Sequence, residues 1–597
     1  MAPRESISLR LTHLGKWVGI SSLIGFVSGV AAALFDRLLG AFEHGVFARL
    51  IGAGTEGLGQ APGRLWILLL LPAGGLLVGW MTQRFAPEAS GHGTEQLIHS
   101  FHRLGGKVRR RVIALKALAS TLTIGTGGSA GAEGPVTQMG SGIGSALSDF
   151  LRFSERDRRI FLLAGSSAGV GALFSAPLGG ALFAPEVLYR KSEFEGEAIV
   201  PCIISSILAY TTFSMLEGAE RRVPVSNALE EALALHDPRE LLLYVLLALL
   251  CTAVSFVYVR TFEATGRLFR RIPRLPAAAR PALGALGVAA LALALAPQAG
   301  GEGILFGGYG LMRATLSDSL PLLTLALLVP AKIVATSLTI ASGGSGGVFA
   351  PSLALGALCG ALVGGWGAQA FPGLGLEPAC YALVGMGGFF AGLAKTPITA
   401  IVIVCELTGS YGLLAPLMLV AVLHLLLSQR WTIYDTQVDG LVDSPAHTGD
   451  FVVDALDGLR VADVLADAQP PETVRENATL REVLDLVATA RSYYHPVVDG
   501  DGHLIGIVSL SDVRRIFRAS EVDHLVIARD FMVEDVVRVT PDEDLNSALR
   551  TMNAHGLHEL PVVSSDDPRR VQAMLTRQTV SKTYHERLRR LRQPASA

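Results

Sequence analysis

Residues 116–135 read KALASTLTIGTGGSAGAEGP, an apolar segment that ends in glycines, one acidic side chain, Glu133, and Pro135. The chain repeats this segment once, because residues 332–351 read KIVATSLTIASGGSGGVFAP, at a constant offset of 216 positions. In the second copy Phe349 stands where the first copy has Glu133. A duplicated apolar segment that is broken by glycines and charged in only one copy indicates a transport site between two repeats.

The composition is that of a membrane protein. Half of the 597 residues are apolar, 17% are charged and the mean hydropathy is +0.44, which is too apolar for a soluble protein of several domains. The long apolar runs end near residue 432, and a hydrocarbon core needs roughly 20 helical residues. We therefore expect a polytopic protein in a lipid bilayer. The net charge of −2 and the short basic runs argue against a nucleic-acid partner.

Two further repeats predict the domain organisation. Gly165, Pro177 and Glu186 recur 220 positions later as Gly385, Pro397 and Glu406, so the membrane part is an internal duplication of broken helices. Beyond it, the motif that ends in HPVV at residue 498 recurs 65 positions later as LPVV at residue 563. The predicted parts are repeat 1 (1–215), a connector (216–238), repeat 2 (239–432), a linker (433–457) and two soluble units (458–520 and 524–586).

Each soluble unit is predicted to be an α/β unit with two strands between two helices. The first helices are predicted at 479–490 and 544–554, the first strands at 497–499 and 562–564, and the second strands at 504–509 and 571–576. Basic residues in the loops of the first membrane repeat predict, by the positive-inside rule, that those loops face the cytoplasm.

Glu133 is the main candidate for chemistry. Pro135 suits the first turn of a helix, which puts Glu133 at a helix N-terminus, where free N–H groups and the helix dipole favour negative charge. A carboxylate there occupies an anion site. If it were protonated and moved aside, a mobile anion would take its place, which makes Glu133 a gate and a proton carrier. The alternative is a glutamate that only caps a helix.

Two other patterns suggest different chemistry. Both glycine-rich turns fit G-x-S-x-G, around Ser129 and Ser345, so a membrane serine hydrolase is a candidate, but that motif needs a preceding strand and a histidine partner. The pattern His92-x-x-Glu95-x-x-x-His99-x-x-His102 would place four metal ligands on one helix face, although Gly91 and Gly93 oppose a helix there. We favour neither, and we predict no metal site, since the five cysteines also lack CxxC spacing.

Three motifs give the chain a family resemblance. GAEGP at 131–135 resembles the gating-glutamate motif of the CLC chloride channels and chloride/proton antiporters, GVFAP at 347–351 resembles their second anion-binding motif, and GHGTE at 91–95 stands where that family has GSGIP. The resemblance covers about residues 15–435, and 458–586 resembles a tandem pair of CBS domains. It implies an all-α polytopic membrane domain built from two inverted repeats of broken helices, plus a soluble α/β CBS-domain pair.

The resemblance also implies roles for individual residues. Glu133 would be the gating and proton-carrying residue. The anion-binding residues would be Gly91, His92, Gly93, Val348, Phe349 and Tyr434. The transported ligand would be chloride or a related small inorganic anion, with no cofactor required. The protein would be a homodimer with one pore per subunit, in a bacterial inner (plasma) membrane, with both termini cytoplasmic.

The chain departs from the family pattern at functional positions. His92 replaces the usual anion-coordinating serine, so it either contacts the anion and suits a non-chloride anion, or points away from the pore. Val187 stands where the antiporters have an inner proton-accepting glutamate, which leaves channel and antiporter both open. Ser509 and Asp512 fit the ribose-contacting pattern of CBS domains, so the pair is either an adenine-nucleotide site or a structural dimerisation module.

Overall fold

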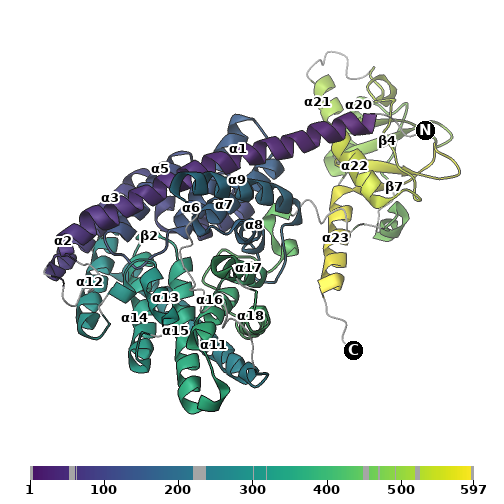
Figure 1. Cartoon of the computed structure of the whole chain (residues 1–597). Helices are drawn as coiled ribbons and strands as arrows, with labels where there is room; N and C mark the ends of the chain where they lie inside the picture. Colours follow the sequence, from purple (N-terminus) through teal and green to yellow (C-terminus); the bar gives the residue numbers. More distant parts are fainter. Residues whose placement is uncertain are drawn as a thin grey trace. The chain divides into compact units, whose positions relative to one another are not determined.

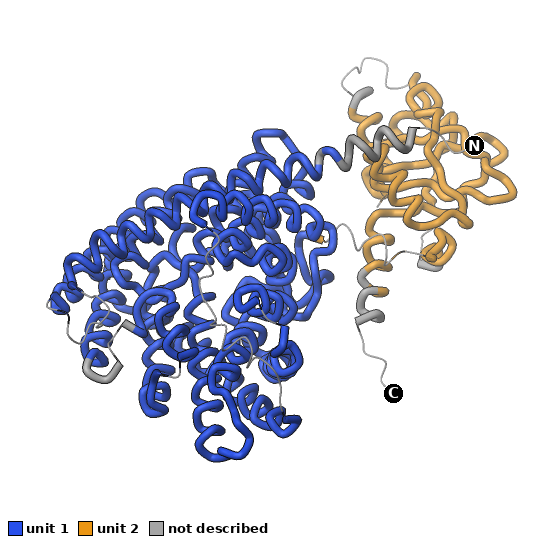
Figure 2. Tube along the Cα trace, in the orientation of Figure 1, with its two compact units in different colours: residues 1–446 blue, residues 447–597 orange. Residues whose placement is uncertain are grey.

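The computed structural model describes residues 5–52, 61, 63–218, 237–273, 275–299, 302–317, 319–409, 411–447, 456, 458–467, 471–490, 492–517 and 525–592. Most of the predicted connector 216–238 and part of the predicted linker 433–457 lie outside these residues. The chain forms two compact units, Met1–Ala446 and His447–Ala597 (Figure 2). The exact boundaries of the predicted repeats and soluble units stay predictions.

The first unit is a bundle of long and short helices (Figure 1). Those of the first repeat are α1 (Glu5–Phe42), α2 (Arg49–Ile51), α3 (Ile67–Phe85), α4 (Gly93–Arg103), α5 (Arg111–Gly125), α6 (Glu133–Phe150), α7 (Glu155–Phe174), α8 (Pro177–Glu186) and α9 (Ile199–Glu217). Those of the second are α11 (Glu240–Arg271), α12 (Arg280–Ala299), α13 (Tyr309–Leu316), α14 (Leu322–Ile340), α15 (Phe349–Ala370), α16 (Pro378–Ala394), α17 (Pro397–Thr408) and α18 (Leu414–Leu427). Seven helical segments of the described chain are long and apolar enough to cross a membrane.

The glycine-rich turns interrupt the apolar stretches as expected. One turn separates α5 from α6 and the other separates α14 from α15, and each following helix carries a proline as its third residue, Pro135 and Pro351. Proline fits the first helical turn because its missing N–H would have no partner there. The sequence therefore breaks two apolar segments at equivalent places in the two repeats.

The two turns satisfy each other's backbone. The Gly131 N–H donates to the Gly347 carbonyl at 2.8 Å, and the Gly347 N–H donates to the Gly131 carbonyl at 2.7 Å. Similarly, the Ser129 N–H donates to Thr339 Oγ1 at 3.0 Å, and the Ser345 N–H donates to Thr123 Oγ1 at 3.1 Å. Each bond has a counterpart 216 positions away with the repeats exchanged, which is the signature of a local twofold axis.

A second exchange joins α8 and α17. The two carboxylate oxygens of Glu186, at the end of α8, accept the N–H groups of Ile398 (3.0 Å) and Thr399 (2.8 Å), at the start of α17. Those of Glu406 accept the equivalent N–H groups of α8, from Leu178 (3.0 Å) and Gly179 (2.7 Å). Each glutamate thus caps the helix of the other repeat, where unpaired N–H groups attract an anion. These carboxylates are structural partners of the backbone.

The second unit holds two small sheets flanked by helices. Its elements are β3 (Val474–Arg475), α20 (Leu480–Thr489), β4 (Tyr494–Val498), β5 (Leu504–Ser509), α21 (Leu510–Phe517), α22 (Leu545–His555), β6 (Glu559–Val563), β7 (Val571–Thr576) and α23 (Arg577–Arg592). β4 lies between β3 and β5, and β6 pairs with β7. The strands β4 and β6 begin three residues earlier than predicted, because Tyr494 pairs with Ser509 and Glu559 pairs with Thr576.

The crossing of the turns should tolerate no side chain. A Cβ atom on Gly347 would lie 2.6 Å from the Gly134 nitrogen, which is backbone and cannot move aside. We expect Gly347→Ala to lower stability by about 1–3 kcal/mol, the usual cost of overpacking, or to prevent folding. The control is Gly310→Ala in α13, where nothing lies within 4 Å of the added atom. The measurement is the apparent unfolding temperature of each purified variant in detergent, and equal temperatures would contradict the prediction.

Candidate functional site

Glu133 begins α6, as Pro135 predicted, and its equivalent Phe349 begins α15. Both side chains are buried. One carboxylate oxygen of Glu133 accepts a hydrogen bond from the hydroxyl of Tyr309, the first residue of α13. Two helix N-termini and a tyrosine therefore meet at the gate candidate, on the line where the repeats cross.

The loop at 91–93 reaches the same place. Its two-residue strand β1 (Gly91–His92) pairs in parallel with β2 (Ser345–Gly346), next to the second glycine-rich turn. A Cβ atom on Gly93 would lie 2.0 Å from the Gly134 carbonyl oxygen, so the start of α4 packs directly against the start of α6. The structure thus brings together GHGTE, GAEGP and GVFAP, the three motifs that carry the family resemblance.

His92 and Tyr434 lie beside each other at this junction. Their ring centroids are 5.4 Å apart, and the His92 ring is 5.9 Å from that of Phe262. Among the described residues, neither His92 Nδ1 nor the Tyr434 hydroxyl has a hydrogen-bond partner, although both atoms are buried. Buried polar atoms are normally paired, so two neighbouring ones with no protein partner form a place suited to a small polar ligand.

Tyr309 is the residue that sequence reasoning missed. It follows Gly93 by 216 positions, so the loop before α13 is the second-repeat copy of the loop before α4. The sequence signal was weak. Within residues 91–95, Gly91 alone is identical to the residue 216 positions later, Gly307. Applying the same offset of 216 to residues 91–95 would have identified Tyr309 as the counterpart of Gly93.

A buried lysine holds each of these loops. Lys116 Nζ donates to the carbonyls of Ala89 (3.1 Å) and Gly91 (2.7 Å), which precede His92. Lys332, its equivalent, donates to three successive carbonyls that precede Tyr309: those of Ile304 (3.2 Å), Leu305 (3.2 Å) and Phe306 (3.0 Å). Both lysine side chains are fully buried, and backbone carbonyls are their partners. They position the loops that lead to His92 and Tyr309.

The inner position at Val187 is fully buried. Its carbonyl accepts a hydrogen bond from the side-chain amide of Gln437 at 2.8 Å. The neighbouring Glu186 is engaged on both oxygens by the backbone of α17. Glu186 is therefore committed to a structural contact and is a poor substitute for a titrating inner residue.

The histidines of the disfavoured metal pattern do not form a cluster of ligands in the described part of the chain. His102 is buried against Ser444 Oγ (2.8 Å) and the Leu188 carbonyl (3.1 Å), whereas His99 lines a cavity of about 580 Å³. In the described part of the chain, the set of three potential ligands close enough to share an ion is Asp499, Asp501 and His503, in a surface turn. Asp499 already accepts the N–H groups of the other two, which accounts for that cluster.

The hydroxyls of the G-x-S-x-G serines have ordinary partners. Ser129 bonds with Thr336 Oγ1 at 2.9 Å, and Ser345 bonds with Ser120 Oγ at 2.9 Å and with the Ala89 carbonyl at 2.7 Å. Helices α5 and α14 precede the two turns, where a hydrolase would have strands. These contacts give the hydrolase interpretation no support.

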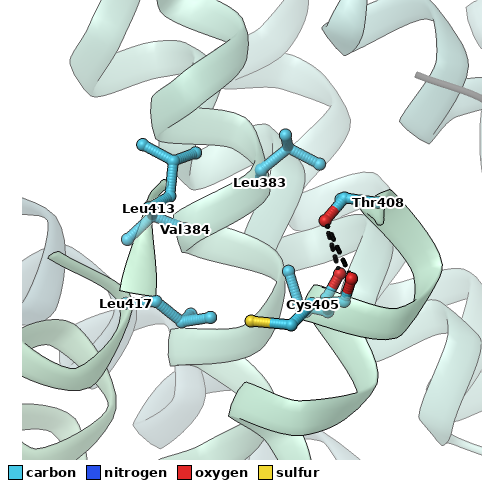
Figure 3. A pocket seen from close by; sticks show the side chains of 7 residues that line it. Leu383, Val384, Cys405, Thr408, Leu413 and Leu417 are labelled. Atoms are coloured by element: carbon cyan, nitrogen blue, oxygen red, sulfur yellow. Dashed lines mark hydrogen bonds between the residues drawn. The ribbon is translucent and has the colours of Figure 1, made fainter. Parts of the chain in front are cut away.

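A small apolar pocket lies elsewhere, between α16, α17 and α18 (Figure 3). Its polar side chain, Thr408, donates to the carbonyls of Val404 (2.8 Å) and Cys405 (3.4 Å). The other lining residues are Leu383, Val384, Val404, Cys405, Leu413 and Leu417. Because the Thr408 hydroxyl already has two partners, we do not consider this pocket a candidate functional site.

In the second unit, Ser509 and Asp512 lie at the start of α21. Asp512 Oδ2 accepts the Ser509 hydroxyl at 2.6 Å and the Ser509 N–H at 3.0 Å. The two side chains therefore form a helix cap together. In the second copy, Thr576 and Thr579 lie 2.9 Å apart in the equivalent place, without the acid. The predicted nucleotide contact stays a prediction.

Comparison with known families settles the class of protein. The model of the voltage gated chloride channel family matches residues 74–429, and the CBS domain model matches residues 461–519 and 528–586. The chain belongs to the CLC family. It carries a C-terminal CBS pair, as its motifs predicted.

Similar proteins span most of the chain. It is 31% identical over 418 residues to the H(+)/Cl(−) exchange transporter ClcA of Cronobacter sakazakii, an alignment that covers 69% of this chain and 86% of the relative. It is 29% identical over 626 residues to the chloride channel protein CLC-f of Arabidopsis thaliana, covering 91% of this chain and 76% of the relative. Both a named exchanger and a named channel are therefore among its relatives.

A solved structure shares the fold. The structure of a slow cyanobacterial Cl−/H+ antiporter matches with a TM-score of 0.61 and 23% identity, covering 69% of this chain and 94% of that one. The predicted fold class is confirmed: a membrane domain of two inverted repeats of broken helices, with an α/β CBS pair. The chain is an integral membrane protein.

Proposed function

We propose that this protein transports chloride or a related small inorganic anion across a membrane, through a pore in each subunit that Glu133 gates. The observation that carries the proposal is the convergence of the 91–93, 131–134 and 347–349 segments on Glu133. Helix N-termini supply partial positive charge and free N–H groups, which attract an anion without a full opposite charge. In the described part of the chain, His92 Nδ1 and the Tyr434 hydroxyl are buried and have no partner that meets hydrogen-bond geometry, so both are suited to donate to a bound anion.

The anion-binding set is proposed to comprise Gly91, His92, Gly93, Val348, Phe349 and Tyr434. Val348 and Phe349 begin α15, where the first N–H groups have no partner within the helix. Glu133 occupies the matching start of α6. A carboxylate and a mobile anion therefore compete for the same kind of site, and protonation of Glu133 removes the competition.

Coupling to protons is the favoured form of this transport, with a passive channel as the alternative. A gate that works by protonation carries one proton each time it moves between the two sides. The exchange activity in the name of the Cronobacter relative supports coupling. Val187 favours the channel, because it cannot titrate.

The remaining proposals concern the setting of the protein. It acts as a homodimer in a bacterial inner (plasma) membrane, with both termini in the cytoplasm; basic loops of the first repeat support this orientation. It requires no cofactor for transport. The CBS pair either binds an adenine nucleotide through Ser509 and Asp512 or serves as a dimerisation module.

The first test replaces the gate by a neutral side chain of the same shape. Glu133→Gln should still conduct anions, because glutamine mimics the protonated glutamate, but should move no protons, because it cannot carry one. The measurement is chloride efflux from proteoliposomes with pH recorded, for wild type and variant. Absence of wild-type efflux under every anion gradient would refute anion transport.

The second test asks whether His92 selects the anion. In proteoliposomes offered chloride, nitrate, fluoride or bicarbonate, His92→Ser should change the order of the transport rates, because a hydroxyl replaces a ring donor at the site. The control is His44→Ser, since His44 is exposed and bonds to its own helix. An unchanged order in His92→Ser would remove His92 from the binding set.

The third test concerns the hydroxyl that holds the gate. Tyr309→Phe removes a hydrogen bond to a carboxylate, a loss of about 1.5–3 kcal/mol, so the displaced form of Glu133 should become about tenfold or more populated. Anion efflux should rise accordingly. Tyr411→Phe, at an exposed position, serves as the control. Equal efflux in all three proteins would show that Tyr309 does not restrain the gate.

A further inference from the structure

His92 is paired with a second carboxylate. Glu95 lies three residues further on, at the start of α4, and its Oε2 is 3.7 Å from His92 Nε2. Its Oε1 accepts the Thr436 N–H at 2.8 Å, which fixes the carboxylate next to the segment that carries Tyr434. Among the described residues, Glu95 Oε2 and His92 Nδ1 are buried atoms without a hydrogen-bond partner. A carboxylate oxygen and an imidazole nitrogen thus face each other, and the far ring nitrogen of His92 makes no hydrogen bond to the described part of the chain.

Titratable groups continue along α4 to a cavity. His99 follows Glu95 by four residues, which places the two side chains on the same helix face, about 5–6 Å apart at their Cβ atoms. His99 lines the cavity of about 580 Å³, together with Gln96 of the same helix. Lys107, Arg109 and Arg110 line it too, so the positive-inside rule assigns it to the cytoplasmic side.

His99, Glu95 and His92 form a row of titratable side chains. At its other end this row reaches Glu133, the proposed gate. The His92 ring stands beside that of Tyr434, and the carboxylates of both Glu95 and Glu133 act electrostatically on the Tyr434 hydroxyl. The charged groups that face the pair from neighbouring elements are Lys116, which acts on His92, and Asp435, which acts on Glu95. The row therefore joins a cytoplasmic cavity to the gated site.

The internal duplication shows that the fold does not need these groups. At the offset of 216 positions, His92, Glu95 and His99 correspond to Gly308, Leu311 and Thr315. The equivalent helix α13 forms without them. Side chains that one repeat can replace by apolar or small residues are available for function.

We propose that Glu95 is the inner proton-transfer residue of this transporter and that His92 relays its proton to the gate. The inference rests on the proposed proton-coupled transport. It gives the protein an inner acid although Val187 cannot titrate and Glu186 is committed to the backbone of α17.

Each proposed proton transfer forms one bond and breaks another. Water in the cavity delivers a proton by way of His99, and an O–H bond forms on Glu95 Oε2. That bond breaks as His92 Nε2 takes the proton, directly after a small side-chain rotation or through one water, since 3.7 Å exceeds hydrogen-bond distance. The imidazolium releases its Nδ1 proton through water to the Glu133 carboxylate. His92 then carries its proton on Nε2, and exchange with water, which removes that proton and adds one at Nδ1, restores the starting tautomer.

The test is Glu95→Gln in the full-length protein, reconstituted in liposomes, with chloride and proton movement recorded together. The glutamine oxygen can still accept the Thr436 N–H, so the local structure is retained. We expect chloride flux to persist and proton movement per chloride to fall to the level of protein-free liposomes. Glu88→Gln is the matched control, since Glu88 lines the same cavity but is paired with Arg109, and it should leave the ratio unchanged.

Each other outcome overturns the inference. Wild-type proton coupling in Glu95→Gln would show that protons take another route, and loss of both fluxes in that variant would make Glu95 a structural residue. Wild-type chloride flux without proton movement would refute the inference and the coupled mechanism but leave anion transport intact. Absence of wild-type flux would refute the proposed function itself.

Discussion

The structure depends on two stretches of non-helical backbone that satisfy each other at membrane depth. Hydrocarbon offers no hydrogen bonds, so a broken helix is stable only where protein or a wet cavity supplies them. Here the turn around Gly131 and the turn around Gly347 exchange two backbone bonds, and each donates a further bond to a threonine hydroxyl of the other repeat. Because the helices α6 and α15 begin directly after the crossing, their positive ends necessarily converge.

The crossing of the two turns explains why the site needs few charged side chains to attract an anion. Once two helix N-termini meet, an anion is attracted by partial charges that the backbone provides without a buried cation beside it. The buried lysines serve a different purpose, since Lys116 and Lys332 bond to loop carbonyls and so position His92 and Tyr309. The lysines thus position the loops around the site, whereas the proposed anion contacts come mainly from backbone N–H groups.

The sequence predicted much of this arrangement and missed what depends on distant contacts. The offset of 216 identified the equivalent turns, and Pro135 correctly put Glu133 at a helix start. The bond between Tyr309 and Glu133 joins residues 176 positions apart and follows no local pattern. Likewise, the early starts of β4 and β6 depend on pairing with β5 and β7, which hydrophobic alternation in one strand does not reveal.

Comparison of the two repeats distinguishes polar side chains that the fold requires from those that are available for function. Lys116 and Lys332, like Glu186 and Glu406, occur in both repeats and make equivalent bonds to backbone, so the twofold fold accounts for them. Glu133, His92, Glu95 and Tyr309 occur in one repeat alone, opposite Phe349, Gly308, Leu311 and Gly93. A fold with twofold symmetry does not require a polar side chain that only one of its repeats carries. In the proposed mechanism the asymmetric set therefore gives the transport path its direction, with Glu133 as the gate at one end and the side chains of α4 at the other.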